Sequence, residues 1–174
     1  MILYLVRHGE AVDVGEKDVE QDADRMLSSE GRKKTKAVAK GLRLVGCQPE
    51  RIVTSPLIRA KQTAEIMAHA LASKVDVEEA QELAVGSHAA KVVTWLRGQA
   101  DVPTLLVGHM PDMGAVASVL VCGNAEASFT FKKAAVCCVS FEGAIQEGKG
   151  RLEWLLQPGQ LRKLGRTIGV GKEI

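Results

Sequence analysis

Short runs of consecutive apolar residues alternate along this chain with longer stretches in which apolar positions recur every three or four residues. The runs at 2–6, 51–54 and 104–108 are bordered by turn residues, which is typical of short strands buried on both faces. Weaker strand candidates lie at 75–79, 135–141 and 151–157. The pattern therefore predicts strands that alternate with helices.

Recognisable helix starts follow the first strands. Ser28 or Ser29 can cap one helix, because a serine hydroxyl accepts a hydrogen bond from a free backbone N–H of the first turn. Ser55 and Pro56 are interpreted as the N-cap and first residue of a second helix, which is expected to run to about Ala72. Further helices are expected at 89–97 and from Pro111 onward.

This alternation predicts an α/β fold, a three-layer α/β/α sandwich with a mostly parallel central sheet. A chain of 174 residues without internal repeats or a linker is most simply one domain. Residues 1–157 are expected to form this domain. Residues 158–174 contain several glycines and no periodicity, so they are expected to form a flexible tail. The acidic stretch 13–25 also lacks a core-facing pattern and is expected to be mobile.

Composition and charge limit the classes of protein to which the chain can belong. The chain is 46% hydrophobic and 25% charged, as in ordinary soluble proteins, and its net charge of +2 is spread without a dense basic patch. No apolar run is long enough to cross a bilayer, and the first has no preceding basic residues, unlike a signal peptide. The four cysteines lack metal-site spacing and are expected to be buried free thiols in a reduced cytoplasm. Nucleic-acid and membrane partners are not expected.

Basic side chains follow each of the three clearest strands. Arg7 and His8 follow the first, Arg59 lies in the opening turn after the second, and the third ends at His109. The carboxyl ends of neighbouring parallel strands form the ligand site of open α/β sheets, so these side chains are expected to converge. Arginine forks match phosphate oxygens, whereas arginines beside histidines disfavour a metal ion. The pattern favours phosphate chemistry with an imidazole nucleophile.

The three strand ends carry a known set of motifs. RHG at 7–9, SPLIRAKQTA at 55–64 and GHMP at 108–111 resemble the histidine phosphatase (phosphoglycerate mutase-like) superfamily. The resemblance extends from about residue 1 to 157 and implies a phosphoglycerate mutase-like fold. The compact length, LSSEG at 27–31 and QEL at 81–83 are most similar to the SixA-type phosphohistidine phosphatases.

The resemblance also implies roles for individual residues. His8 would attack phosphorus through one ring nitrogen, while backbone near Gly9 holds the other and fixes the tautomer. Arg7, Arg59 and His109 would bind the equatorial oxygens, where charge gathers in the transition state. Water would then hydrolyse the phospho-His8 intermediate without a metal or organic cofactor. The arginines are expected to keep His8 unprotonated near neutral pH.

A general acid is less clearly indicated. By resemblance Glu82 is a candidate, but an exposed loop carboxylate explains it equally well, and Met110, directly after His109, cannot donate a proton. An imidazole leaving group has a pKa of about 6.5, so its departure needs less help than that of an alcohol. A weakly supplied acid therefore favours a P–N bond as the substrate.

The expected substrate is a phosphohistidine on a partner protein. Few residues separate the motifs from regular structure, so only 13–25 and 128–135 remain to form a rim around an open site. By resemblance the partner would be a histidine phosphotransfer domain or a phosphotransferase-system carrier. A small-molecule phosphomonoesterase of the same superfamily and a non-catalytic phosphate- or phosphoprotein-binding module are the alternatives. A monomer is expected.

Other charged residues have simpler interpretations. His69 and His88 belong to no motif and are expected at the surface or in packing. A cluster of basic residues lies before and along the first predicted helix. It is interpreted as a solvated face, with docking to an acidic partner as the alternative. Its members are Arg25, Arg32, Lys33, Lys34 and Lys36.

Overall fold

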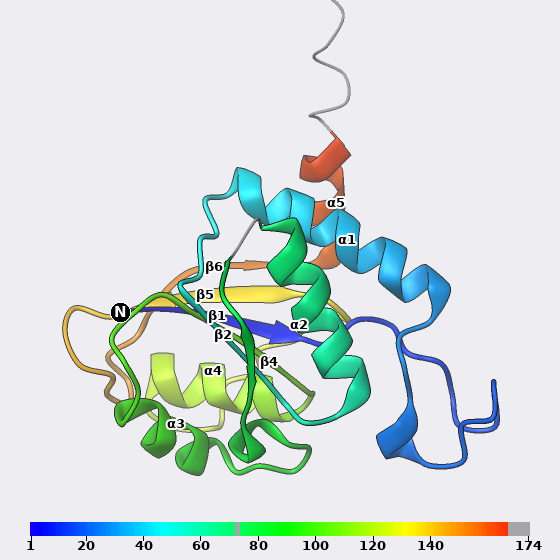
Figure 1. Cartoon of the computed structure of the whole chain (residues 1–174). Coiled ribbons are helices and arrows are strands. Elements are labelled where there is room, and N and C mark those ends of the chain that lie inside the picture. Colours follow the sequence, from blue (N-terminus) through cyan, green and yellow to red (C-terminus); the bar gives the residue numbers. More distant parts are fainter. Residues whose placement is uncertain (72–73, 167–174) are drawn as a thin grey trace, which may run out of the picture.

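One six-stranded sheet forms the centre of the protein (Figure 1), in a computed structural model that describes residues 1–71 and 74–166. The strands are β1 (Ile2–Arg7), β2 (Arg51–Thr54), β3 (Val77–Glu79), β4 (Thr104–Gly108), β5 (Val136–Ser140) and β6 (Arg151–Leu156). Their order in the sheet is β3-β2-β4-β1-β5-β6. Strands β3, β2, β4 and β1 are mutually parallel, and β5 runs antiparallel to both of its neighbours, β1 and β6. The predicted mostly parallel sheet is confirmed.

Helices cover both faces of this sheet (Figure 1). On one face lie α1 (Ser29–Leu44), α2 (Ile58–Ala70) and α5 (Pro158–Arg166), and on the other lie α3 (Ala89–Arg97) and α4 (Asp112–Cys122). Two short 3-10 helices, η1 (Asp22–Asp24) and η2 (Gln81–Leu83), lie in the connections. The three-layer α/β/α architecture is therefore as predicted. No helix in the described part of the chain is long and apolar enough to span a membrane.

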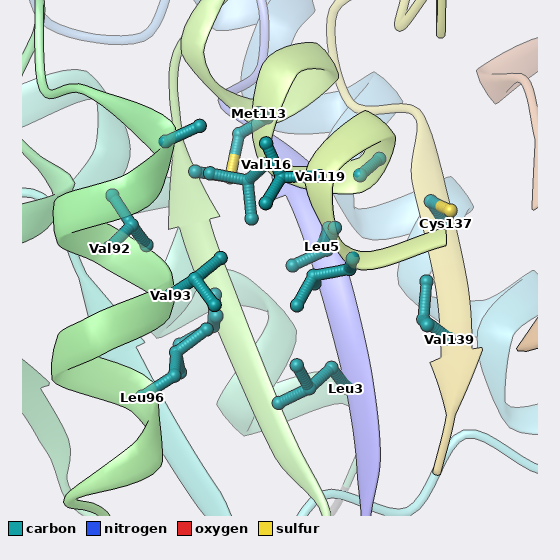
Figure 2. Packing of buried hydrophobic residues seen from close by; sticks show 14 of the residues in the cluster. Leu3, Leu5, Val92, Val93, Leu96, Met113, Val116, Val119, Cys137 and Val139 are labelled. Atoms are coloured by element: carbon teal, nitrogen blue, oxygen red, sulfur yellow. The ribbon is translucent and has the colours of Figure 1, made fainter. Parts of the chain in front are cut away.

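The core is divided by the sheet into two halves. In β1, Leu3 and Leu5 pack toward α3 and α4, as Figure 2 shows, whereas Tyr4 and Val6 pack toward α1, α2 and α5. Successive residues of a strand point to opposite faces, so a strand covered on both sides must be apolar throughout. This requirement explains the continuous apolar run at the start of the chain. It also holds the end of β1 rigidly between two packed layers.

The start of α2 differs from the prediction. The backbone N–H of Ser55 donates to the carbonyl of Val107 in β4 (2.9 Å), so strand-like pairing continues through Ser55. The helix begins only at Ile58, and Ser55 Oγ accepts the N–H of Leu57 (3.3 Å) in the preceding turn. Ser55 is therefore not the N-cap of α2. The cap of α1 is as predicted, since Ser28 Oγ accepts the N–H of Gly31 (2.9 Å).

The expected irregular tail from Pro158 is instead a helix as far as Arg166, and residues 167–174 lie outside the described part of the chain. The side chain of Leu161 is fully buried against α1. The two helices approach so closely that a Cβ on Gly41 would lie 2.1 Å from the carbonyl oxygen of Leu161. This contact depends on a glycine in a different helix, which the local pattern of the tail does not reveal.

The four cysteines are free thiols. Cys47, Cys137 and Cys138 are buried, as expected. Cys122 is exposed, so the expectation of burial is wrong for this residue. It is the last residue of α4, directly before the left-handed Gly123 that ends the helix, where the chain turns away from the core.

Candidate active site

The carboxyl ends of β1 and β4 bring two histidines side by side. The register pairs Arg7 with Gly108, so the next residue of each strand, His8 and His109, leaves the sheet at the same place. Their ring centroids are 5.1 Å apart, with an angle of 54° between the ring planes. The positive charges of Arg7 and Arg59 lower the pKa of both rings, after the larger effect of burial. The two histidines and two arginines singled out from the sequence thus share one site.

His8 is held in a single tautomer. Its Nδ1 lies 2.7 Å from the carbonyl oxygen of Gly9, which can only accept, so Nδ1 carries the hydrogen and Nε2 presents a lone pair. Burial, followed by the nearby charges of His109 and the arginines, lowers the pKa of His8 to about 3. The imidazole is therefore neutral at pH 7. A neutral ring with an available lone pair is the nucleophilic form of histidine.

Gly9 supports this arrangement through close packing. Its N–H donates to Thr63 Oγ1 of α2 (3.0 Å), and a Cβ at this position would lie 2.5 Å from Thr35 Oγ1 of α1. A larger residue would have to displace a helix or rotate the carbonyl that holds His8. The glycine in the RHG motif therefore has a steric reason.

His109 is anchored by Ser55. Nε2 of His109 lies 2.7 Å from Ser55 Oγ, and both residues are buried. Burial and then the charge of Arg59 lower the pKa of His109 to about 4, so this ring is also neutral at pH 7. The sequence pattern predicts only a helix cap at Ser55 and does not indicate this contact. The position of Ser55 directly after a strand that neighbours β4 is the signal that could have revealed it.

The two arginines are oriented by different loops. Arg7 Nη1 donates to the carbonyl of Phe131 (2.8 Å). Arg59 donates from Nη1 to the carbonyl of Asp22 (2.6 Å) and from Nη2 to its Oδ2 (2.8 Å). Asp22 thus offers an anionic oxygen to Arg59, as a phosphate would. The stretch 13–25 therefore reaches the site, although nothing in its sequence singled out Asp22.

Three buried side-chain nitrogens in the described part of the chain have no hydrogen-bond partner. They are Arg7 Nε, Arg59 Nε and His109 Nδ1, and all belong to this site. Buried polar atoms are nearly always hydrogen-bonded, so unpaired ones concentrated in one place indicate a ligand. Arginine nitrogens only donate, and the site carries two guanidinium charges. This set of donors fits an anion with several acceptor oxygens, such as a phosphoryl group.

Glu82 lies on η2, directly beyond the carboxyl end of β3, and is half-buried. It lines a groove of about 340 Å³ together with Ser87, His88 and Lys91. No hydrogen bond or ion pair joins it to either site histidine within the described residues. Its role as a general acid stays a prediction.

Comparison with known proteins decides the family. Residues 3–104 match the model of the histidine phosphatase superfamily (branch 1), a range that contains Arg7, His8 and Arg59 and ends at the first residue of β4. The chain belongs to the histidine phosphatase superfamily. The predicted resemblance to this superfamily is thereby confirmed.

Individual relatives refine this assignment. An uncharacterized protein of Picosynechococcus sp. is 40% identical over 139 residues, which cover 78% of this chain and 82% of that protein. Phosphohistidine phosphatase SixA of Escherichia coli is 26% identical over 171 residues, 97% of this chain and 100% of SixA. The structure of the protein histidine phosphatase SixA complexed with tungstate superposes with a TM-score of 0.79 and 26% identity, covering 92% of this chain and 99% of that one. These similarities support phosphatase activity.

Proposed function

We propose that this protein is a phosphohistidine phosphatase, which removes the phosphoryl group from a histidine of a partner protein through a phospho-His8 intermediate. The observation that carries the proposal is the neutral, tautomer-fixed His8 beside buried donors that lack partners. Similarity to SixA over nearly the whole chain supports the phosphohistidine substrate. A histidine phosphotransfer domain or a phosphotransferase-system carrier is the kind of partner that we expect.

The first step transfers the phosphoryl group to the enzyme. Nε2 of His8 attacks phosphorus as the P–N bond of the substrate breaks, and the bonding electron pair stays on the substrate imidazole, which takes up a proton. Arg7 and Arg59 neutralise the charge that spreads over the equatorial oxygens. For Arg59 to do so, phosphoryl oxygens replace the carboxylate of Asp22 on its guanidinium.

The second step regenerates the enzyme. Water attacks phosphorus of phospho-His8, the bond to Nε2 breaks and its electron pair returns to the ring, and inorganic phosphate leaves with the hydroxyl group of that water while the other proton of the water passes to solvent. The hydrogen bond from Nδ1 to Gly9 keeps the ring in place through both steps, because the same tautomer is needed before and after. His109, held by Ser55 through Nε2, binds the phosphoryl group through its unpaired Nδ1 and supplements the arginine donors.

The demand for a general acid is modest in this reaction. The leaving nitrogen belongs to an imidazole, whose pKa of about 6.5 lies far below that of an alcohol. Glu82 remains our candidate for protonating it, because η2 follows β3 at the same edge of the sheet as the histidines. A phosphate monoester would depend much more strongly on such a group.

Trapping of the intermediate tests this proposal. The protein is mixed with a ³²P-labelled phosphohistidine protein, denatured within milliseconds to seconds, and mapped by proteolysis. We expect a label on His8 that is labile in acid and stable in base. His8→Ala should carry no label, whereas His69→Ala, a matched change of an exposed histidine in α2, should be labelled as the wild type is. A label on serine or cysteine, or label retained by His8→Ala, would contradict the mechanism.

Substrate competition separates the proposal from its alternatives. Turnover of the phosphohistidine protein is compared with that of sugar phosphates and p-nitrophenyl phosphate. We expect kcat/KM to be higher for the phosphohistidine protein. Faster turnover of a sugar phosphate would identify a small-molecule phosphomonoesterase. Binding of the phosphoprotein without any turnover, unchanged in His8→Ala, would identify a binding module.

A further inference from the structure

A second, basic hollow lies beside the site, on the side of α1 and α5. Its volume is about 240 Å³, and its charged lining consists of four cationic side chains and one carboxylate. These are Lys34, Lys132, Lys133, Arg162 and Glu10. The four cations come from three separate parts of the chain, namely α1, the segment before β5, and α5.

The hollow and the site share backbone. The N–H of Ala134, which lines the hollow, donates to the carbonyls of both Arg7 and His8 (3.1 Å each). Thr35, another lining residue, is the side chain against which Gly9 packs. Glu10 follows His8 by only two residues. The hollow therefore lies directly against the backbone that carries His8.

The hollow carries an excess of positive charge. Lys34 Nζ lies 2.9 Å from Glu10 Oε2 and 3.9 Å from Glu30 Oε1, so its charge is compensated. Lys132 and Lys133 are exposed and form no ion pair within the described residues, and Arg162 donates from Nε to a backbone carbonyl instead of a carboxylate. The hydrogen bond from Lys34 and the charge of Lys133 lower the pKa of Glu10, which places Lys133 close to that carboxylate. Three of the four cations thus form no ion pair with a carboxylate in the described part of the chain.

The backbone that presents these cations is held in place. Lys132 donates its N–H to Gln157 Oε1 (3.1 Å), and Gln157 Nε2 donates to the carbonyl of Thr130 (2.7 Å). The carbonyl of Phe131, one residue earlier, accepts from Arg7 in the phosphate site. Hydrogen bonds therefore connect residues 130–132 both to Gln157, directly before α5, and to Arg7 in the phosphate site. A binding group on a fixed backbone loses less entropy when its ligand arrives.

We propose that this basic hollow binds an acidic side chain, glutamate or aspartate, that neighbours the phosphohistidine on the partner protein. The inference rests on the proposed function, because it names what the protein substrate must carry next to its phosphoryl group. A carboxylate is small enough for a hollow of about 240 Å³ and has the sign opposite to its excess charge. Lysine ammonium groups bind carboxylates without demanding the bidentate geometry that an arginine fork imposes. The hollow thus selects among phosphohistidine proteins by their local charge.

Binding of a stable mimic tests the inference without turnover. Two peptides are compared, each with a central phosphoryl-triazolylalanine in place of phosphohistidine, one flanked by glutamates at the second and third positions on either side and the other by glutamines. Fluorescence anisotropy gives the two Kd values. An exposed ion pair changes affinity only a few-fold, so the glutamate peptide should bind about three- to tenfold more tightly to the wild type.

Variants test which side chains produce the preference for the glutamate peptide. In Lys132→Ser/Lys133→Ser the ratio of the two Kd values should fall to about one. In Lys36→Ser/Lys40→Ser, which removes the same charge from exposed positions of α1 outside the hollow, the ratio should stay close to that of the wild type. Glu10→Gln removes the one carboxylate that lines the hollow and leaves Lys34 only its more distant partner Glu30, so it should raise the ratio above the wild-type value. An unspecific effect of surface charge would not confine the fall in the ratio to the variant at Lys132 and Lys133.

The outcomes distinguish failure of this inference from failure of the proposed function. If both peptides bind and the glutamate preference is absent, or is equally lost in both double variants, the hollow does not read an acidic side chain, and the phosphohistidine site still stands. If neither peptide binds, the proposed function fails and this inference fails with it. A preference abolished only by the change at Lys132 and Lys133 supports the inference.

Discussion

The hydroxyl of Ser55 lies 2.7 Å from Nε2 of His109, although 54 residues separate the two along the chain. They meet because β2 and β4 are neighbours, and the N–H of Ser55 donates to Val107 one strand position before Gly108. A buried imidazole with one nitrogen anchored in this way cannot rotate away from the site. Ser55 is therefore a positioning residue for His109.

Removal of this hydroxyl should slow turnover. In Ser55→Ala, His109 keeps its ring but loses the partner that orients it, at a cost of about 1–2 kcal/mol, so kcat should fall roughly tenfold or more. KM should change less, because both arginines remain. Ser55→Thr, which retains a hydroxyl, should recover most of the activity. The matched control is Ser118→Ala, since Ser118 is also fully buried and hydrogen-bonded but lies in α4. Equal kcat values for Ser55→Ala and the wild type would contradict this role.

Asp22 should compete with anions for Arg59. Its carboxylate and carbonyl occupy both terminal nitrogens of a guanidinium that is only 4% exposed. In Asp22→Asn the charge that competes with phosphate is gone, so inorganic phosphate and tungstate should inhibit about three- to tenfold more strongly. The measurement is the inhibition constant against a fixed phosphohistidine substrate.

Asp24→Asn is the control for this change. Asp24 lies in the same 3-10 helix and is exposed, and its side chain makes no ion pair within the described residues. Its variant should show the wild-type inhibition constants. Weaker inhibition in Asp22→Asn would mean that Asp22 orients Arg59 for the ligand instead of competing with it.

Acidification should destabilise the fold through the two site histidines. Their pKa values are lowered to about 3 for His8 and about 4 for His109, chiefly by burial, whereas the unfolded chain binds these protons near pH 6.5. The unfolded state therefore gains protons first as the pH falls. The free energy of unfolding is complete above about pH 6.5 and decreases below it, by up to about 1.4 kcal/mol per pH unit for each histidine.

Urea unfolding between pH 7.5 and pH 5 measures this effect. His109→Asn should flatten the dependence of the unfolding free energy on pH, because one of the two buried imidazoles is removed. His88→Asn, a change at an exposed histidine, should leave the slope unchanged. A wild-type stability that is constant over this range would show that the histidines take up protons in the folded state.

Much of the fold follows from local pattern. The central residues of β1, β2 and β4 are apolar on both faces because helices cover both sides of the sheet, so the sequence indicates these strands. Their ends carry His8, Arg59 and His109, and the rule that parallel strand ends share one edge is sufficient to bring these together. This part of the site needs no information on side-chain contacts.

The remaining features depend on contacts between distant segments. Asp22 lies in a stretch without periodicity, and its place is set by Arg59, 37 residues away. Ser55 satisfies a local rule for helix caps, which conceals that strand pairing to Val107 delays the helix. In both cases the sequence contains the residue, but its partner is defined only by the assembled sheet.

The seam between α1 and α5 gives a last prediction. A Cβ on Gly41 would lie 2.1 Å from the carbonyl oxygen of Leu161 and 2.7 Å from its carbonyl carbon, so Gly41→Ala must push α5 away from α1. Because both contacts are backbone atoms, no side chain can rotate to relieve them, and we expect a loss of about 2–3 kcal/mol in the free energy of unfolding. Gly159→Ala is the matched control, because Gly159 lies in α5 and a Cβ there meets nothing within 4 Å. It should be neutral or slightly stabilising in the same urea titration, since alanine favours a helix.

The same substitution should affect the basic hollow. A hydrogen bond joins Gln157, directly before α5, to the backbone of Lys132, so Gly41→Ala should also weaken the preference of the hollow for the glutamate peptide. Wild-type stability in Gly41→Ala would mean that α5 is not docked on α1.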